Sequence, residues 1–249
     1  MKKINKNEIA ISVEDLHVYY RDMKKFSLKK NGLKVGNFKG GVFKAVKGVS
    51  FEIPKGQIVG ICGKNGSGKS TLLRAISGIF SADSGSINLH SNSISLLSIG
   101  VGFQKQLTGY ENIFLSGMLL GFSKEQIEDK VQEIIDFSEL GDFINKPVRS
   151  YSSGMYSKLA FSITAILETD IILIDEVLSV GDIHFKEKSY NKMKELISDS
   201  NRTVVIVSHS TKTITELCDR VIWLHDGKIK DDGDPKKIMA DYEEFMRQE

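Results

Sequence analysis

The stretch IVGICGKNGSGKSTLL, Ile58–Leu73, joins three kinds of local sequence without a break. Its first five residues carry no polar side chain, which is typical of a strand buried on both faces of a parallel sheet. A turn with three glycines follows, and the residues from Lys69 onward have the apolar spacing of a helix. A buried strand that turns sharply into a helix predicts an α/β fold around a central sheet.

The turn itself, GKNGSGKS at Gly63–Ser70, has the spacing of a phosphate-binding loop for ATP. Its glycines allow backbone N–H groups to turn inward around an anion, and the N-terminus of the next helix adds partial positive charge. The Lys69 ammonium is expected to reach the β- and γ-phosphates, and the Ser70 hydroxyl to ligate Mg²⁺. The residues predicted to bind the nucleotide are Gly63, Lys64, Asn65, Gly66, Ser67, Gly68, Lys69, Ser70 and Thr71.

Two further apolar runs end in polar residues. The run IILI is followed by Asp175 and Glu176, and TVVIV is followed two residues on by His209. Because ligands of open α/β sheets bind at the carboxyl ends of the strands, all three side chains are expected beside the phosphate loop. Asp175 is predicted to hold Mg²⁺ through water, Glu176 to polarise the attacking water, and His209 to contact the γ-phosphate. Surface charge for the acids and a structural role for the histidine are the alternatives.

The composition is that of an ordinary globular protein of 249 residues, with 41% hydrophobic and 27% charged residues. No run approaches the roughly 18 apolar residues of a membrane-spanning helix, and the polar start does not fit a secretion signal. Cys62 and Cys218 are too few for a disulfide framework, so both are predicted to be buried thiols. These features predict a cytoplasmic protein.

Positive charge is concentrated at the N-terminal end. The first 50 residues hold 12 Lys or Arg against 4 Asp or Glu, whereas the remainder holds 22 against 28. Much of this charge lies in the Lys- and Gly-rich segment 21–41, which is predicted to form a short basic helix and a flexible loop between strands. The bias favours an anionic membrane surface as a partner, and a solvated basic face is the alternative.

The stretch YSSGMYSKLAFS, which begins at Tyr151, lies between the phosphate loop and the strand-end acids. With the phosphate loop, the strand-end acids and the strand-end histidine in this order, the chain resembles the nucleotide-binding subunit of ATP-binding cassette (ABC) transporters. The resemblance covers nearly the whole length, and this stretch is then the signature motif. The family's usual form is Leu-Ser-Gly-Gly-Gln, which Ser152 and Gly154 match, whereas Tyr151, Ser153 and Met155 depart from it.

The resemblance implies an ABC-type ATPase that works as a head-to-tail homodimer. Each signature motif would cover the ATP held by the other subunit's phosphate loop, with Ser152, Ser153 and Gly154 acting in trans. It also implies one nucleotide-binding domain over residues 1–249, with a mixed central sheet, flanking helices, an antiparallel β subdomain and a helical subdomain at about 105–160. A C-terminal helix over 235–249 closes this domain, and no carbohydrate-binding domain is expected.

Three other family positions are placed by resemblance alone. The aromatic residue that stacks on adenine aligns with Tyr20, and the neighbouring Tyr19 is the alternative. The glutamine that contacts Mg²⁺ and the membrane partner corresponds to Gln104, with Gln106 as the alternative. The segment Ser179–Asp182, SVGD, resembles the loop that communicates across the dimer.

The segments LLSIGVGFQKQLTGYENI and IDEVLSVGD resemble the subfamily that exports lipid-linked polysaccharides, the O-antigen and teichoic acid exporters. The implied function is ATP hydrolysis that drives export of such a glycan across the cytoplasmic membrane. The homodimer would bind two copies of a separate multi-span permease at the cytoplasmic face of a bacterial membrane.

Three alternatives remain open at this point. The nearest is the same enzyme with a lipid, peptide or drug as cargo. A soluble ABC ATPase of translation or DNA repair fits less well, because the coiled-coil insertion and zinc-binding cysteines of that class are absent from the sequence. No nucleic-acid partner is therefore expected. A P-loop kinase or small GTPase would not account for the signature stretch.

Overall fold

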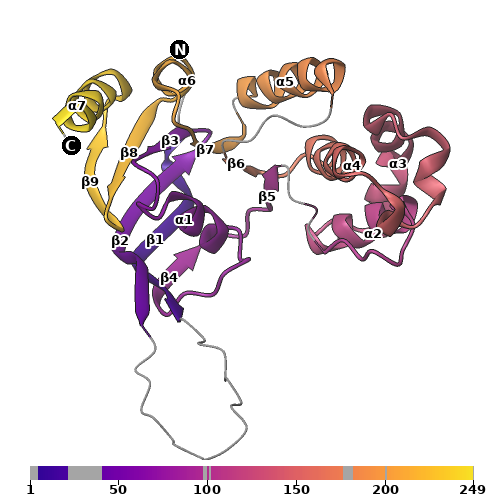
Figure 1. Ribbon diagram of the computed structural model, residues 1–249, viewed down its shortest axis with the longest axis horizontal. Coiled ribbons are helices and arrows are strands. Elements are labelled where there is room, and N and C mark those ends of the chain that lie inside the picture. Colours follow the sequence, from indigo (N-terminus) through magenta and orange to yellow (C-terminus); the bar gives the residue numbers. More distant parts are fainter. Residues whose placement is uncertain are drawn as a thin grey trace, which may run out of the picture.

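A computed structural model of the protein describes residues 5–21, 41–97, 100, 102–175, 182–199 and 201–248. Within these residues the strands form two sheets, and the helices lie on both faces and at both ends of the larger sheet (Figure 1). The basic segment predicted between the first strands lies outside the described residues, apart from Arg21 and Gly41. Glu176 and the segment 179–181 also lie outside them.

The larger sheet has six strands in the order β5-β6-β7-β3-β8-β9. Neighbouring strands are parallel except β8 and β9, which form an antiparallel hairpin. β3 and β7 are buried along their whole length, as their apolar sequences predict. The strands are β3 (Ile58–Cys62), β5 (Ile94–Leu97), β6 (Ile171–Asp175), β7 (Thr203–Val207), β8 (Arg220–His225) and β9 (Lys228–Gly233).

A smaller antiparallel sheet covers one face of the larger one. Its strands are β1 (Asn5–Arg21), β2 (Val42–Lys55) and β4 (Ser84–Asn88), in the order β2-β1-β4. Helix α1 (Lys69–Ile76) lies between the two sheets, and side chains from all three layers form one apolar core. The predicted helix after the glycine-rich turn is therefore confirmed.

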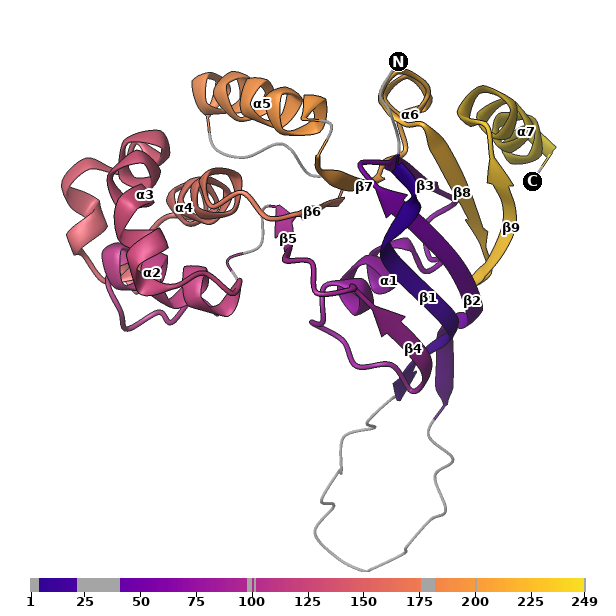
Figure 2. The ribbon, with the colours of Figure 1, turned by 180° about the vertical axis from the view of Figure 1, so that it is seen from behind.

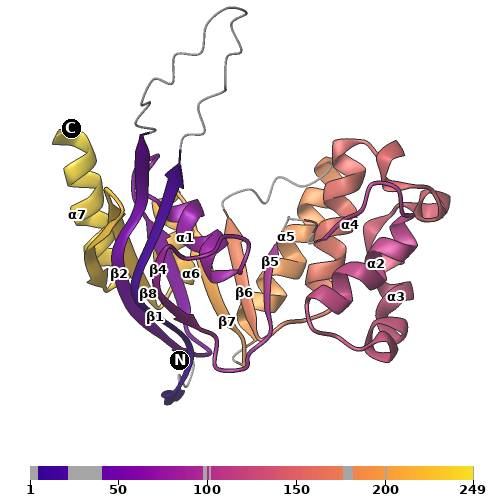
Figure 3. The ribbon, with the colours of Figure 1, turned by 90° about the horizontal axis from the view of Figure 1, so that it is seen from below.

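A separate group of helices stands beyond β5 and β6 (Figure 3). It consists of α2 (Gly109–Leu119), α3 (Lys124–Ser138) and one side of α4 (Ser153–Ile166), around a core of their own. A capping box of Ser123 and Gln126 is present at the start of α3. A second capping box, Thr108 with Glu111, starts α2 and did not enter the sequence prediction.

The second face of the larger sheet is covered by the other side of α4, by α5 (Ile183–Ser198), by α6 (Thr211–Leu217) and by α7 (Pro235–Gln248). Helix α7 packs along β8 and β9 through Ile238, Met239 and Tyr242, and confirms the predicted last helix (Figure 2). Among the described residues no helix has both the length and the apolar character needed to cross a membrane.

Candidate functional site

The glycine-rich turn between β3 and α1 is shaped by close contacts that exclude side chains. A Cβ atom on Gly63 would lie 2.2 Å from the carbonyl oxygen of Leu224, and one on Gly68 would lie 2.4 Å from that of Ala45. Both glycines also have positive φ, at 145° and 103°. Only glycine combines this backbone conformation with this close approach.

The same turn is held from behind by the β8–β9 hairpin. The N–H of Gly227 donates to the carbonyl of Ser67 at 3.1 Å, and the carbonyl of Gly227 accepts from the N–H of Lys47 at 2.8 Å. Strand β2 and the hairpin turn therefore fix the loop through backbone hydrogen bonds. These bonds hold the turn in the conformation that its sequence predicts for an anion-binding loop.

Inside the loop, Lys69 and Ser67 have buried polar side chains. The Lys69 ammonium is 6% exposed and donates to the carbonyls of Gly63 at 2.7 Å and Lys64 at 3.0 Å. The Ser67 hydroxyl is buried and has no hydrogen-bond partner among the described residues. A buried lysine and an unsatisfied hydroxyl within a loop of inward-turned amides fit a phosphate ligand, which supplies several oxygen acceptors.

The two predicted metal ligands meet at the start of α1 and the end of β6. The Ser70 hydroxyl donates to the Asp175 carboxylate at 3.3 Å. A hydroxyl and a carboxylate at this separation offer the oxygen donors that Mg²⁺ prefers. The residues present therefore fit the predicted metal ion.

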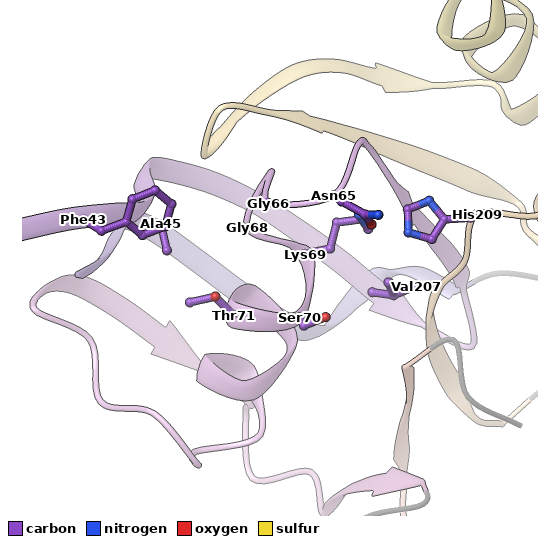
Figure 4. Close-up of a pocket in the computed structure, with 10 residues that line it drawn as sticks. All are labelled: Phe43, Ala45, Asn65, Gly66, Gly68, Lys69, Ser70, Thr71, Val207 and His209. Carbon is purple, nitrogen blue, oxygen red and sulfur yellow. The ribbon is translucent and has the colours of Figure 1, made fainter. Parts of the chain in front are cut away.

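A pocket of about 190 Å³ opens over this loop (Figure 4). His209, which follows β7, lies at one end beside Asn65 and Lys69, and Phe43 lies at the opposite end. Seven of the residues predicted from the sequence line the pocket: Asn65, Gly66, Gly68, Lys69, Ser70, Thr71 and His209. Phe43, Ala45 and Val207 complete its lining. Sequence reasoning missed Phe43, although its alternation with Ala45 along β2 places both on one face of the strand.

Tyr20 and Tyr19, the two alternatives for the adenine-stacking position, point to different neighbours. The Tyr20 hydroxyl shares a hydrogen bond of 3.0 Å with the hydroxyl of Thr71 on α1. Tyr19 instead forms a hydrogen bond with His17 at 2.9 Å, and the Lys44 ammonium lies over its ring at 5.1 Å. Of the two tyrosines, Tyr20 is therefore the one tied to the helix that begins the phosphate site.

Gln104 and Gln106 are both exposed, and neither lines the pocket. The backbone N–H of Gln104 donates to the side chain of Asn112 at 2.7 Å, and Asn112 in turn donates to the Gln104 carbonyl at 3.1 Å. Asn112 thus fixes the main chain where the glutamine loop was predicted. The choice between the two glutamines stays a prediction.

The signature stretch lies at the start of α4, in the separate group of helices. Ser152 is the N-cap, and its hydroxyl accepts from the N–H of Met155 at 3.2 Å. Ser153 and Gly154 form the exposed or half-exposed first turn, and none of the three lines the pocket. In one copy of the chain, α4 stands apart from α1, whose first residues line the pocket (Figure 1), so the pocket and this helix N-terminus are separate surfaces.

The two cysteines take no part in this site as nucleophiles. Burial raises the pKa of Cys62 and of Cys218 to about 12. Both thiols therefore stay protonated at neutral pH, as expected of structural cysteines.

Comparison with known proteins identifies the family. The sequence profile described as ABC transporter matches residues 46–179, which include the phosphate loop, Asp175 and the signature stretch. The chain belongs to the ABC transporter family. This membership confirms the resemblance on which the sequence prediction rested.

Named relatives of this ABC protein come from several bacteria. It is 44% identical over 202 residues to the O-antigen export system ATP-binding protein RfbB of Myxococcus xanthus, which covers 81% of this chain and 46% of that one. It is 44% identical over 203 residues to the teichoic acids export ATP-binding protein TagH of Bacillus anthracis, covering 82% and 37%. An RfbB of Klebsiella pneumoniae is 40% identical over 208 residues, and 84% of each chain is covered. The chain thus spans less than half the length of the first two relatives.

Solved structures confirm the fold of the ABC cassette. An ATP-binding subunit of an ABC transporter superposes with a TM-score of 0.70 at 21% identity, over 94% of this chain and 93% of that one. A post-hydrolysis dimer of the cassette MJ0796 with ADP and Pi gives 0.67 at 22% identity, over 90% and 98%. The predicted α/β fold with an antiparallel sheet and additional helices is therefore confirmed.

Proposed function

We propose that this chain is the ATP-hydrolysing subunit of a bacterial exporter of lipid-linked polysaccharide or teichoic acid. The proposal rests on one observation: a pocket lined by phosphate-loop residues occurs in a chain that is 40–44% identical to proteins named for O-antigen and teichoic acid export. The family supports ATP as the ligand. The export relatives support the cargo.

The residues of the pocket divide the chemistry among them. Lys69 and the loop amides bind the β- and γ-phosphates, and Ser70 and Asp175 hold Mg²⁺, which neutralises phosphate charge. Gln104, with Gln106 as the alternative, would be a further Mg²⁺ ligand, although neither glutamine lines the pocket in this chain. His209 contacts the γ-phosphate, and Glu176 orients the water for in-line attack.

A second copy of the chain is needed to complete this site. The pocket volume of about 190 Å³ is below the roughly 300–1,000 Å³ of a complete ligand site. The Ser152 helix N-terminus, an anion-binding feature, lies outside it in the same copy. In the homodimer, Ser152, Ser153 and Gly154 of one subunit cover the phosphates bound by the other.

An exposed apolar surface on α2 supports a membrane-protein partner. Met118 and Leu119 are 52% and 58% exposed, and Tyr110 lies near the start of the same helix at 38%. Gly102, at the glutamine loop, lies against Leu119, since a Cβ on it would come within 2.1 Å of that side chain. A helix of the permease bound to Met118 and Leu119 would therefore lie next to the loop that contains Gly102 and Gln104. Two permease copies and two cassettes at the cytoplasmic face of the membrane form the proposed assembly.

The test is capture of the Glu176→Gln variant with ATP from detergent-solubilised membranes of its host, followed by mass spectrometry of proteins and lipids. This variant retains ATP and keeps the dimer closed. The same variant without nucleotide is the control. Co-purification of a multi-span permease with a lipid-linked glycan supports the proposal. A permease with another cargo would change the substrate, and ribosomal or DNA-repair proteins would overturn the export function.

A further inference from the structure

We propose that Tyr151 and Tyr156, the two tyrosines of the signature stretch, are positioning residues that hold the main chain on both sides of Gln104. This inference rests on the proposed function, because it concerns how the same ATPase site is assembled. The usual Leu-Ser-Gly-Gly-Gln form of the motif contains neither tyrosine: Tyr151 occupies the leucine position, and Tyr156 follows the motif. Neither lines the phosphate pocket of its own chain, and each acts through the segments that it contacts.

Tyr156 holds the segment that precedes Gln104. Its ring meets the ring of Phe103 edge-on, with centroids 4.9 Å apart and planes inclined by 62°. Its hydroxyl lies close to Gly100, since a Cβ atom on that glycine would come within 2.8 Å of it. Because Tyr156 stands in the first turns of α4, shortly after the N-cap Ser152, these contacts tie the entry of the glutamine loop to the start of the signature helix.

Tyr151 holds the segment that follows Gln104. Its hydroxyl donates to the carbonyl of Phe143 at 2.8 Å and lies against Gly109, the first residue of α2, where a Cβ atom would come within 2.2 Å of it. The Tyr151 ring packs against the apolar core of this group of helices, and burial raises the pKa of its hydroxyl. Phenylalanine at this position would therefore keep the packing of the ring and lose the hydrogen bond.

Backbone hydrogen bonds join the same two parts of the chain. The N–H of Arg149 donates to the carbonyl of Lys105 at 2.8 Å, and the N–H of Val148 donates to that of Leu107 at 2.9 Å. The segment that leaves Gln104 is thus paired with the segment that enters the signature stretch. The two segments cannot shift relative to each other without breaking these hydrogen bonds.

The main chain is fixed here, whereas the polar residues that it carries remain exposed. Asn112 is fully buried and bonds to both the N–H and the carbonyl of Gln104, while Gln104 itself is exposed. Ser152 is likewise exposed at the start of α4. Exposed polar groups on a fixed backbone are preorganised, because less conformational entropy is lost when a ligand binds. The tyrosines thereby place Gln104 toward its own site and Ser152 toward the site of the partner subunit.

The experiment places Tyr156→Ala in one chain at a time of a dimer that has a single complete site. Mixing Lys69→Ala and Ser152→Arg chains gives such dimers: the Ser152→Arg chain binds ATP, and the Lys69→Ala chain supplies the intact signature stretch. We expect Tyr156→Ala to lower kcat by about 10- to 100-fold in either chain, because small misplacements of reacting groups are costly. The KM for ATP should change little, since the phosphate loop is not altered.

Conservative and control variants separate positioning from a general loss of structure. Tyr156→Phe should retain kcat, because it keeps the ring that contacts Phe103, whereas Tyr151→Phe should lower kcat in either chain through loss of one hydrogen bond. Tyr110→Ala is the matched control, because Tyr110 lies in the same group of helices, is 38% exposed and contacts Phe114 of its own helix. It should leave kcat unchanged.

A covalent link between the two segments tests the pairing directly. Lys105→Cys and Arg149→Cys in one chain are joined by a short cleavable thiol cross-linker at neutral pH, where the native thiols stay protonated. We expect ATP hydrolysis to continue at the rate of the unlinked variant, because the two segments already stay together during turnover.

Hydrolysis that stops on cross-linking and returns when the linker is cleaved would overturn the inference. A fall in kcat for only one placement of Tyr156→Ala would overturn it too, because the tyrosine would then act on a single segment. If Tyr156→Ala does not fold, as circular dichroism shows, the two placements of Tyr151→Phe decide in the same way. Absence of hydrolysis by the wild type would instead contradict the proposed function.

Discussion

Gly227 connects the β8–β9 turn to the phosphate loop through its own backbone. It donates to Ser67 and accepts from Lys47, and a Cβ atom on it would lie 2.7 Å from the carbonyl oxygen of Ala45. Its φ of 78° is in the left-handed region. The residue thus combines a conformation that favours glycine with a contact that leaves no space for a side chain.

We expect Gly227→Ala to lower the free energy of unfolding by about 1–3 kcal/mol more than Gly78→Ala, because only the first adds overpacking to backbone strain. Gly78 has a φ of 75°, and its Cβ would meet nothing within 4 Å. Chemical denaturation of both variants measures the difference. Gly227→Ala should also weaken triphosphate binding, whereas Gly78→Ala should not. Equal stability of the two variants would contradict the role given to the contact.

The Lys69 ammonium organises the loop even without a ligand, since it bonds to two loop carbonyls. We expect Lys69→Ala to weaken ATP binding by about 10- to 100-fold, because a charge-assisted contact to phosphate is lost. Equilibrium binding of a fluorescent ATP analogue measures this effect. An unchanged affinity would exclude Lys69 from the phosphate site. Lys105→Ala, which removes an exposed lysine outside the pocket, is the control for charge alone.

At the scale of the elements, α3, α4 and α5 are joined by one group of charged residues. Lys158 of α4 lies 2.7 Å from Asp182, the N-cap of α5, and 3.3 Å from Glu139 at the end of α3. Lys188 of α5 also contacts Glu139, at 3.0 Å. This charged junction links the helix that starts with the signature stretch to the helix that follows the segment 176–181.

The charged junction depends on pH with a defined sign. The hydrogen bond from Lys158 lowers the pKa of Asp182 from 3.8 to about 2. Burial works to raise the pKa of Glu139, but the hydrogen bonds from Lys188 and Lys158 outweigh it and lower that pKa below 4.5. Since both folded-state pKa values are depressed, the two carboxylates stabilise the fold above their ordinary pKa values. This contribution is lost as the pH falls from about 4.5 toward 2.

We expect Lys158→Met to lower the Tm by a few degrees at pH 7, and the difference from wild type to disappear as the pH falls toward 2. Thermal unfolding followed by circular dichroism measures both effects. Lys130→Met is the control, because the salt bridge of Lys130 is with the exposed Glu133 three residues on in α3, and surface pairs of this kind contribute little. A difference that persists unchanged at low pH would show that packing of the Lys158 stem, rather than its charge, stabilises the junction.

At this scale, features encoded by a few consecutive residues could be predicted from the sequence, whereas contacts between residues far apart in the chain could not. β3, β6 and β7 were predictable because each contains an apolar run of four or five residues within one short window of sequence. The meeting of Ser70 with Asp175 was predictable as well, since strand ends converge at one edge of a parallel sheet. The charged junction was not, because its residues come from three helices and only the tertiary packing brings them together. Phe43 was missed for the same reason: its neighbour Tyr20 comes from another strand.

At the scale of the whole molecule, the pocket and the signature helix are separate surfaces of one chain, so hydrolysis should require two copies. We expect Lys69→Ala and Ser152→Arg to be inactive when tested alone. A mixture of the two should recover up to about a quarter of the wild-type rate, because half of its dimers are mixed and each mixed dimer has one complete site. Phosphate release by the mixture, at constant total protein, measures the recovery.

The control repeats the mixing of Lys69→Ala and Ser152→Arg chains with Glu176→Gln added to one of the two. When Glu176→Gln is added to the Ser152→Arg chain, the only complete site loses its water-orienting acid and the recovery should vanish. When it is added to the Lys69→Ala chain, the recovery should persist. Activity of either single variant alone would contradict a site shared between two copies.

The backing of the phosphate loop by the β8–β9 turn has a consequence for how the protein is made. Ser67 leaves the ribosome about 160 residues before Gly227, which corresponds to roughly 10–30 s at ordinary rates of synthesis. Throughout that interval the loop and β2 are present, but the hydrogen bonds that brace the loop from behind have not formed. The nascent chain can therefore complete the backbone bracing of its phosphate loop only after the hairpin has been synthesised and has docked.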